Sequence, residues 1–116
     1  MQKTLKSLEK SKVVKNYIII DARIGAHFYY LKIKANLIDD SVLFIREFVS
    51  DREYLYSYHW QDRNGKLRIR WDNAPHHKHV KTYPHHKHTP EVLESYETTL
   101  DDVLDVIEKI IAKREK

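Results

Sequence analysis

The feature that most constrains the fold is the alternation of apolar and polar side chains between residues 17 and 72. β-Branched and aromatic residues dominate this stretch, and a period of two is typical of strands that bury one face. Turn-forming residues divide the stretch, so we expect strands at 17–24, 27–37, 42–49, 54–61 and 66–72. The sequence therefore predicts an antiparallel sheet of about five strands.

The last expected hairpin turns at Asn64-Gly65, a strong hairpin signal because both residues tolerate positive φ. A two-residue turn there pairs Tyr58 with Trp71 and His59 with Arg70. One face of the hairpin is then aromatic, and the other carries the groups that can do chemistry. Those groups are Ser57, His59, Gln61, Arg68, Arg70 and Asp72.

Helices are expected at both ends of the sheet. Residues 98–114 place apolar side chains at i, i+3 and i+4, with Thr99 as a cap, and should cover the aromatic face. Residues 1–15 are rich in lysine with few apolar anchors, which predicts a short, partly exposed helix. The expected fold is one α+β domain over residues 1–116, interrupted by a histidine-rich loop at 73–91.

Two polar or aromatic features of the strands have structural interpretations. The four aromatic residues of the fourth strand could stack bases, but aromatics at period two more often form a core, and we assign them to packing. They are Tyr54, Tyr56, Tyr58 and Trp60. Glu47, beside Arg46 on the third strand, is best interpreted as half of a cross-strand ion pair rather than an acid-base group.

Charge and composition limit the classes of partner. The 116 residues carry a formal net charge of +4, which favours an anionic partner such as RNA, although a solvated basic surface explains it equally well. The absence of cysteine excludes disulfides, thiolate metal sites and thiol nucleophiles. No apolar run approaches the ~20 residues that span a bilayer. We therefore expect a cytoplasmic protein with no membrane partner.

Six of the eight histidines fall between residues 76 and 88, in a segment whose length favours a functional loop. Neutral imidazole binds zinc, copper or nickel, and also exchanges protons near neutral pH, so this segment suits either a metal site or acid-base catalysis. A surface loop without chemistry remains an alternative. The candidate metal ligands are His76, His77, His79, His85, His86 and His88.

Three runs of sequence resemble the TumE family of prokaryotic toxins from toxin-antitoxin systems. They are YSYHWQD at 56–62, RWDNAPHH at 70–77 and PHHKH at 84–88. The Asp-Asn step followed by a downstream His-Lys-His is the most specific part, and the resemblance extends through the C-terminal helix. It implies a toxin that a small cognate antitoxin protein neutralises, with growth inhibition through RNA.

The resemblance and the chemistry of RNA cleavage together give a set of candidate residues. Cleavage needs a base for the 2′-hydroxyl, an acid for the leaving oxygen and cations for the charged phosphorane. The candidate catalytic residues are His59, Arg70, Asp72, Asn73, His86 and His88, with His76 and His77 as further candidates. The candidate RNA contacts are Arg68, Arg70, Lys78 and Lys87. Asp72 and Asn73 would orient the site.

Three functions stay open at this point. The first is a metal-independent ribonuclease toxin, which requires no cofactor. The second is an enzyme or binding module that uses the histidine clusters to hold a zinc-like divalent metal. The third is a non-catalytic module that binds nucleic acid or a partner protein, and self-association into a homo-oligomer is compatible with each.

Overall fold

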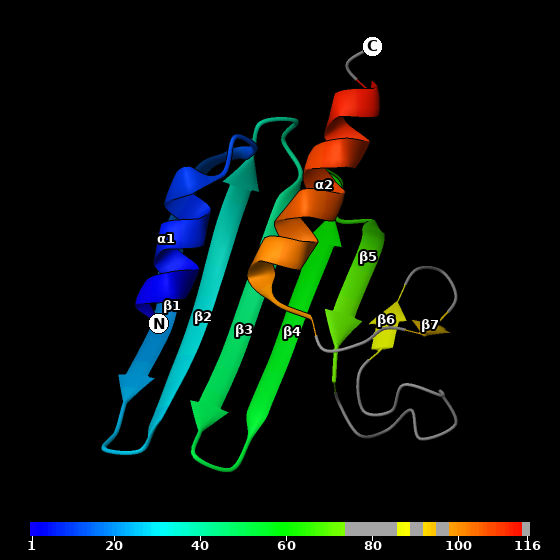
Figure 1. Ribbon diagram of the computed structural model, residues 1–116. Helices are drawn as coiled ribbons and strands as arrows, with labels where there is room; N and C mark the ends of the chain where they lie inside the picture. Colours follow the sequence, from blue (N-terminus) through cyan, green and yellow to red (C-terminus); the bar gives the residue numbers. More distant parts are fainter. Residues whose placement is uncertain (74–85, 89–91, 95–97, 115–116) are drawn as a thin grey trace.

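A computed structural model describes residues 1–73, 86–88, 92–94 and 98–114 of the chain. Within these residues, one seven-stranded antiparallel sheet runs in sequence order from edge to edge (Figure 1). The expected α+β sheet is confirmed, with two short strands added to the five long ones. The strands are β1 (Val14–Ile24), β2 (Phe28–Leu37), β3 (Val42–Ser50), β4 (Tyr54–Gln61), β5 (Leu67–Asp72), β6 (His86–His88) and β7 (Val92–Glu94).

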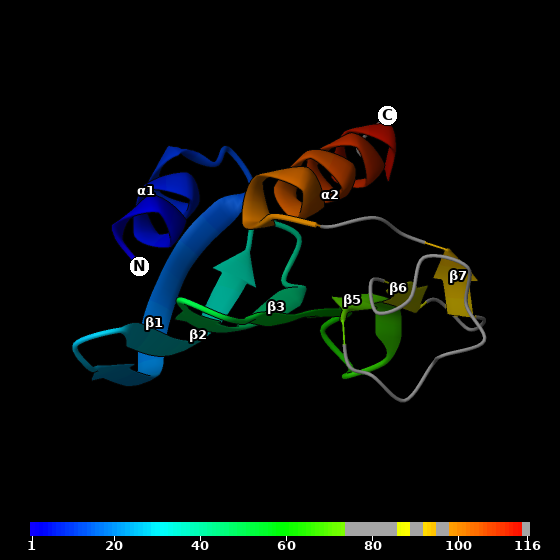
Figure 2. The same ribbon diagram turned by 60° about the horizontal axis from the view of Figure 1, so that its bottom comes forward.

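Both helices, α1 (Gln2–Lys10) and α2 (Leu100–Arg114), lie on the same face of the sheet (Figure 2). The predicted cap of α2 is confirmed, because the Asp102 backbone N–H donates to Thr99 Oγ1 at 3.3 Å. The Asp102 carboxylate in turn accepts from the Thr99 N–H at 3.0 Å, which satisfies two N–H groups of the helix start. α1 ends five residues before the expected boundary, since Val14 already pairs with Leu37 in the sheet.

The core fills the space between the helices and the sheet. β2, β3, β4 and β5 contribute alternate residues to it, and α2 contributes one apolar stripe. The packing role predicted for the aromatic residues of β4 is confirmed for the three that are buried there. Fully or nearly fully buried members include Leu31, Ile33, Leu43, Ile45, Tyr56, Tyr58, Trp60, Trp71, Val103, Ile107 and Ile111.

The predicted pairing of β4 with β5 is confirmed at Tyr58–Trp71 and His59–Arg70, but the turn between the strands differs. The Asp62 N–H donates to the Lys66 carbonyl at 2.8 Å, so three residues form the loop, with Gly65 at φ 84°. A bulge at Arg68 then absorbs one residue, because Trp60 pairs with Ile69 while Gln61 pairs with Leu67. The two irregularities cancel, which preserves the expected register.

One part of the expected histidine-rich loop is a strand. His86–His88 form β6, which pairs with β5 so that His88 lies opposite Arg70 and His86 opposite Asp72. The pairing supplies backbone partners along β5, whose edge would otherwise present unpaired N–H and C=O groups. Residues 74–85 and 89–91 of the expected loop lie outside the described residues. In the described part of the chain, no helix is long and apolar enough to cross a membrane.

Candidate functional site

The two helices cover one face of the sheet and leave the other uncovered (Figure 2). On the uncovered face, β2 to β5 place cations, aromatic rings and the imidazole of His59. We call it the open face. Strand register arranges its residues in rows across β2 to β5, because directly paired residues share a face. The rows are Tyr30, Phe48 and Leu55; then Lys32, Arg46, Ser57 and Asp72; then Lys34, Phe44, His59 and Arg70.

His59 is the imidazole of the open face. Its Nε2 lies 3.1 Å from Gln61 Oε1, and its ring contacts Phe44 edge-on with centroids 6.2 Å apart. Burial lowers the pKa of His59 below its ordinary value of 6.5, and the neighbouring charge of Arg70 lowers it further, against an opposing effect of Gln61. The ring is therefore neutral near pH 7 and able to accept a proton.

Arg70 and Asp72 form an ion pair beside His59. Arg70 Nε donates to Asp72 Oδ2 at 2.9 Å, and the two residues share a face because they stand two apart in β5. The Asp72 side chain is only 2% exposed, whereas that of Arg70 is 43% exposed. The buried carboxylate thus fixes the orientation of a guanidinium that solvent or a ligand can reach.

Asn73 directs its amide to the backbone of β4. The side-chain nitrogen donates to the Tyr54 carbonyl at 2.6 Å, and Oδ1 accepts from the Tyr56 N–H at 3.0 Å. This pair of bonds extends the β4–β5 ladder by one step beyond Asp72. Asn73 therefore holds the end of β5 in place against β4.

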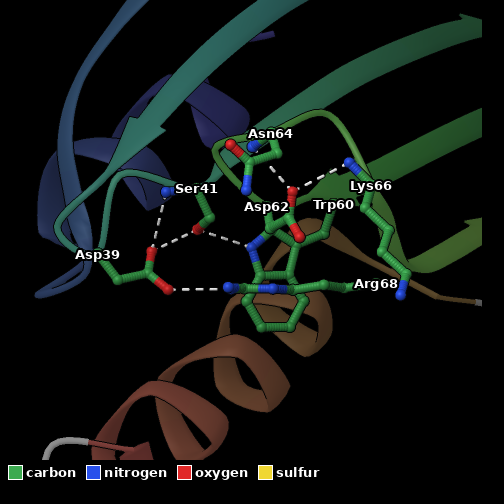
Figure 3. A network of polar contacts seen from close by, with 7 residues as sticks. All are labelled: Asp39, Ser41, Trp60, Asp62, Asn64, Lys66 and Arg68. Atoms are coloured by element: carbon green, nitrogen blue, oxygen red, sulfur yellow. Dashed lines mark hydrogen bonds and ion pairs between the residues drawn. The ribbon is translucent and has the colours of Figure 1, made fainter.

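Arg68 does not lie beside Arg70 on the open face. The alternation of β5 predicted that Arg68 shares the face of Arg70, and this prediction is wrong because the bulge turns Arg68 to the covered side. Its guanidinium stacks on the ring of Trp60, 4.9 Å from the centroid, and binds Asp39 Oδ2 at 2.9 Å (Figure 3). Ser41 completes this network, since its Oγ accepts from Trp60 Nε1 at 2.9 Å.

A groove of about 400 Å³ lies on the open face beside the Arg70–Asp72 pair. Tyr30, Arg46 and Phe48 line it together with Leu55 and Ser57, and the sequence patterns predicted none of the first three as site residues. The signal for them was available: β3 carries phenylalanine at both 44 and 48 on the face opposite its buried leucine and isoleucine. Apolar residues on both faces of a strand indicate a second contact surface.

Glu47 lies on the covered face, and the cross-strand ion pair expected for it is wrong, because among the described residues hydroxyl groups rather than a cation bind its carboxylate. The carboxylate accepts from Thr4 Oγ1 at 2.5 Å and from the Tyr58 hydroxyl at 2.6 Å, and the residue is 4% exposed. Burial and the charge of Glu47 raise the pKa of Tyr58, and burial raises the pKa of Tyr54 to about 12. Both hydroxyls therefore stay protonated at neutral pH.

The remaining candidates belong to residues 76–88, only part of which the structure describes. His76, His77, Lys78, His79 and His85 are outside the described residues. His86, Lys87 and His88 are placed by backbone pairing, with Lys87 opposite Trp71. Among the residues that the structure describes, no group of three potential ligands could hold a metal ion.

A comparison with protein families identifies the chain. The family model described as Toxin TumE matches residues 4–113, which include most of α1, the whole sheet and nearly all of α2. Neither a curated protein nor a solved structure matches the chain. The match confirms the resemblance carried by the motifs of β4, β5 and β6. The chain therefore belongs to the TumE family of toxins of toxin-antitoxin systems, which implies a cognate antitoxin as its partner.

Proposed function

We propose that this toxin is a ribonuclease that cleaves RNA on the open face of its sheet without a metal ion. The observation that carries the proposal is the pairing of His59 with Arg70 across β4 and β5. A neutral imidazole and an accessible guanidinium thus lie side by side, and the buried carboxylate of Asp72 fixes the guanidinium through its ion pair with Arg70. They supply the base and the cation that phosphodiester transfer requires.

In the proposed reaction, neutral His59 accepts the proton of a ribose 2′-hydroxyl. The 2′-oxygen forms a bond to phosphorus while the bond from phosphorus to the 5′-oxygen breaks. Arg70 stabilises the additional negative charge on the phosphoryl oxygens. A second histidine, in its protonated imidazolium form, gives its proton to the leaving 5′-oxygen. We assign this role to His86 or His88, whose backbones pair with Asp72 and Arg70.

Binding of the RNA strand is assigned to the remaining cations of the open face. Lys32, Lys34 and Arg46 stand in the same two rows as the proposed catalytic groups. They would neutralise phosphates on either side of the cleaved bond and release counterions, which makes binding sensitive to salt. Lys87, the other cation expected to contact RNA, pairs with Trp71 of the core on the covered face, so it is not assigned to this binding surface.

The test is cleavage of a mixed RNA substrate by the purified protein, with and without chelator. We expect cleavage to survive chelator and to fall by a factor of about 10² or more in His59→Gln and in Arg70→Gln. His27→Gln is the matched control, since His27 lies in the β1–β2 turn beside Asp51, away from the open face. Circular dichroism would confirm that each variant is folded.

Each other outcome contradicts the proposal in a defined way. Cleavage that chelator abolishes would favour the metal-dependent alternative, in which the histidine clusters hold the ion. Full activity of His59→Gln would reject the assigned base. Salt-sensitive RNA binding without any cleavage by the wild type would favour a non-catalytic binding module.

A further inference from the structure

The groove on the open face has an apolar floor beside the proposed cleavage site. Tyr30 pairs with Phe48, and Phe48 pairs with Leu55, so the three side chains form one row across β2, β3 and β4. Phe48 also stacks on Phe28, with ring centroids 5.9 Å apart and planes at 23°. Leu55 is 42% exposed and Phe28 is 42% exposed. This floor therefore lies open to a ligand.

Two cations border the same floor. Arg46 lies between Phe44 and Phe48 on the open face of β3 and is exposed. Among the described residues, no carboxylate forms an ion pair with Arg46. Arg70 lines the groove as well and is held by Asp72. An apolar floor between an unpaired arginine and an oriented one suits a ligand that is flat, unsaturated and attached to a phosphate.

We propose that this groove binds one unpaired base of a single-stranded RNA, next to the phosphate that His59 and Arg70 cleave. The inference rests on the proposed ribonuclease function and names its substrate class. Leu55 and His59 are four residues apart in β4, which is about 13 Å along the strand. A base on the floor and a phosphate at His59 therefore belong to neighbouring parts of one strand.

The shape of the open face favours single strands over duplexes. Bases in an RNA duplex are stacked on one another, so they cannot lie flat on a protein surface, whereas unpaired bases stack on aromatic side chains. The groove volume of about 400 Å³ lies in the range of small-ligand pockets. Arg46 would contact the phosphate of the same nucleotide, because its guanidinium borders the floor.

The test measures binding of a fluorescent 2′-O-methyl oligonucleotide, which cannot be cleaved because its 2′-oxygen carries no proton. The single strand and the same strand in a duplex are compared by fluorescence anisotropy. We expect Phe48→Ala and Leu55→Ser to weaken binding of the single strand by about tenfold and to change duplex binding little. Ile38→Ser is the matched control for Leu55→Ser, since Ile38 is 45% exposed in the turn after β2.

Arg46→Gln separates the phosphate contact from base stacking. It should reduce the slope of log affinity against log salt concentration by about one, whereas Leu55→Ser should leave the slope unchanged. Arg52→Gln is the control, because Arg52 is exposed in the β3–β4 turn. An equal salt slope in Arg46→Gln and wild type would reject the phosphate contact.

Failure of the base pocket and failure of the ribonuclease proposal give different results. If the wild type cleaves RNA while Phe48→Ala and Leu55→Ser, both folded by circular dichroism, bind the single strand normally, the pocket is rejected and the ribonuclease stands. If the wild type cleaves nothing but both variants lose single-strand binding, the pocket stands and the ribonuclease is rejected. A wild-type preference for duplex RNA would overturn the pocket as well.

Discussion

The two faces of the sheet differ in what their apolar side chains contact. On β3, Leu43 and Ile45 point under the helices and are buried, while Phe44 and Phe48 alternate with them on the open face. The apolar side chains of the covered face pack into the core. The open face carries aromatic rings beyond what the core uses, interleaved with cations, as the proposed binding of RNA requires.

The sharpest test of this comparison uses two neighbouring residues of β3. Ile45→Ala should lower the free energy of unfolding by about 2–5 kcal/mol, because it leaves a cavity under the helices. Phe44→Ala should cost less than about 1 kcal/mol, since its side chain is only partly buried, on the open face. Urea unfolding followed by circular dichroism measures both. Equal losses would show that the open face is also part of the packed interior.

A second test compares one pair of residue types in two environments. The Tyr58 hydroxyl donates to buried Glu47 at 2.6 Å, whereas the Tyr17 hydroxyl donates to Glu9 at 3.1 Å in an exposed position. Tyr58→Phe should cost about 1.5–3 kcal/mol of unfolding free energy, because the buried carboxylate loses a donor. Tyr17→Phe should stay within about 0.5 kcal/mol of the wild type.

Thermal or urea unfolding distinguishes these outcomes. A small loss in Tyr58→Phe would mean that the Thr4 hydroxyl alone satisfies Glu47. In that case the covered face would tolerate the loss of a hydrogen-bond donor better than its burial indicates.

The smallest expected effect is the pH dependence contributed by His59. Its pKa is lower in the folded protein than the ordinary value of 6.5, so the unfolded chain binds the proton more readily. The stability that His59 contributes is therefore complete above pH 6.5 and is lost as the pH falls through 6.5 toward the folded pKa. His59→Gln should lose less stability than the wild type between about pH 7.5 and about pH 5.5.

Ribonuclease activity should also depend on the protonation of His59, and it should fall as the pH falls. If His59 is the base, kcat/KM falls as the pH drops below the folded pKa of His59, because the protonated ring cannot accept the 2′-hydroxyl proton. A wild-type stability profile identical to that of His59→Gln would show that the ring titrates alike in the folded and unfolded chain.

Local sequence patterns predicted most of the fold. Period-two alternation located the five long strands, and Thr99 with Asp102 marked the start of α2. The hairpin signal at Asn64-Gly65 predicted the pairing of His59 with Arg70, although the loop has three residues and the bulge at Arg68 restores the register. These features depend on backbone preferences of short segments, which a single sequence carries in full.

The parts that were not predicted depend on long-range contacts. The bulge at Arg68 arises where the side chain finds Asp39 and Trp60, and Asp39 belongs to the turn between two other strands. The pairing of β6 with β5 joins segments that are too far apart in the chain for a short hairpin turn to specify it. The groove needs Tyr30, Phe48 and Leu55 from three strands, whose relative register no local pattern states.

The hydrogen bond between Thr4 and Glu47 affects the order in which the protein assembles. It joins residues 43 positions apart in the chain, whereas the long strands of the sheet pair with their sequence neighbours. Short hairpins close quickly, and contacts between distant residues close late, because more chain entropy is lost in forming them. Glu47 and Tyr58 come together only when β3 meets β4. α1 therefore precedes the sheet in the sequence, but we expect it to dock only after β3 and β4 have paired.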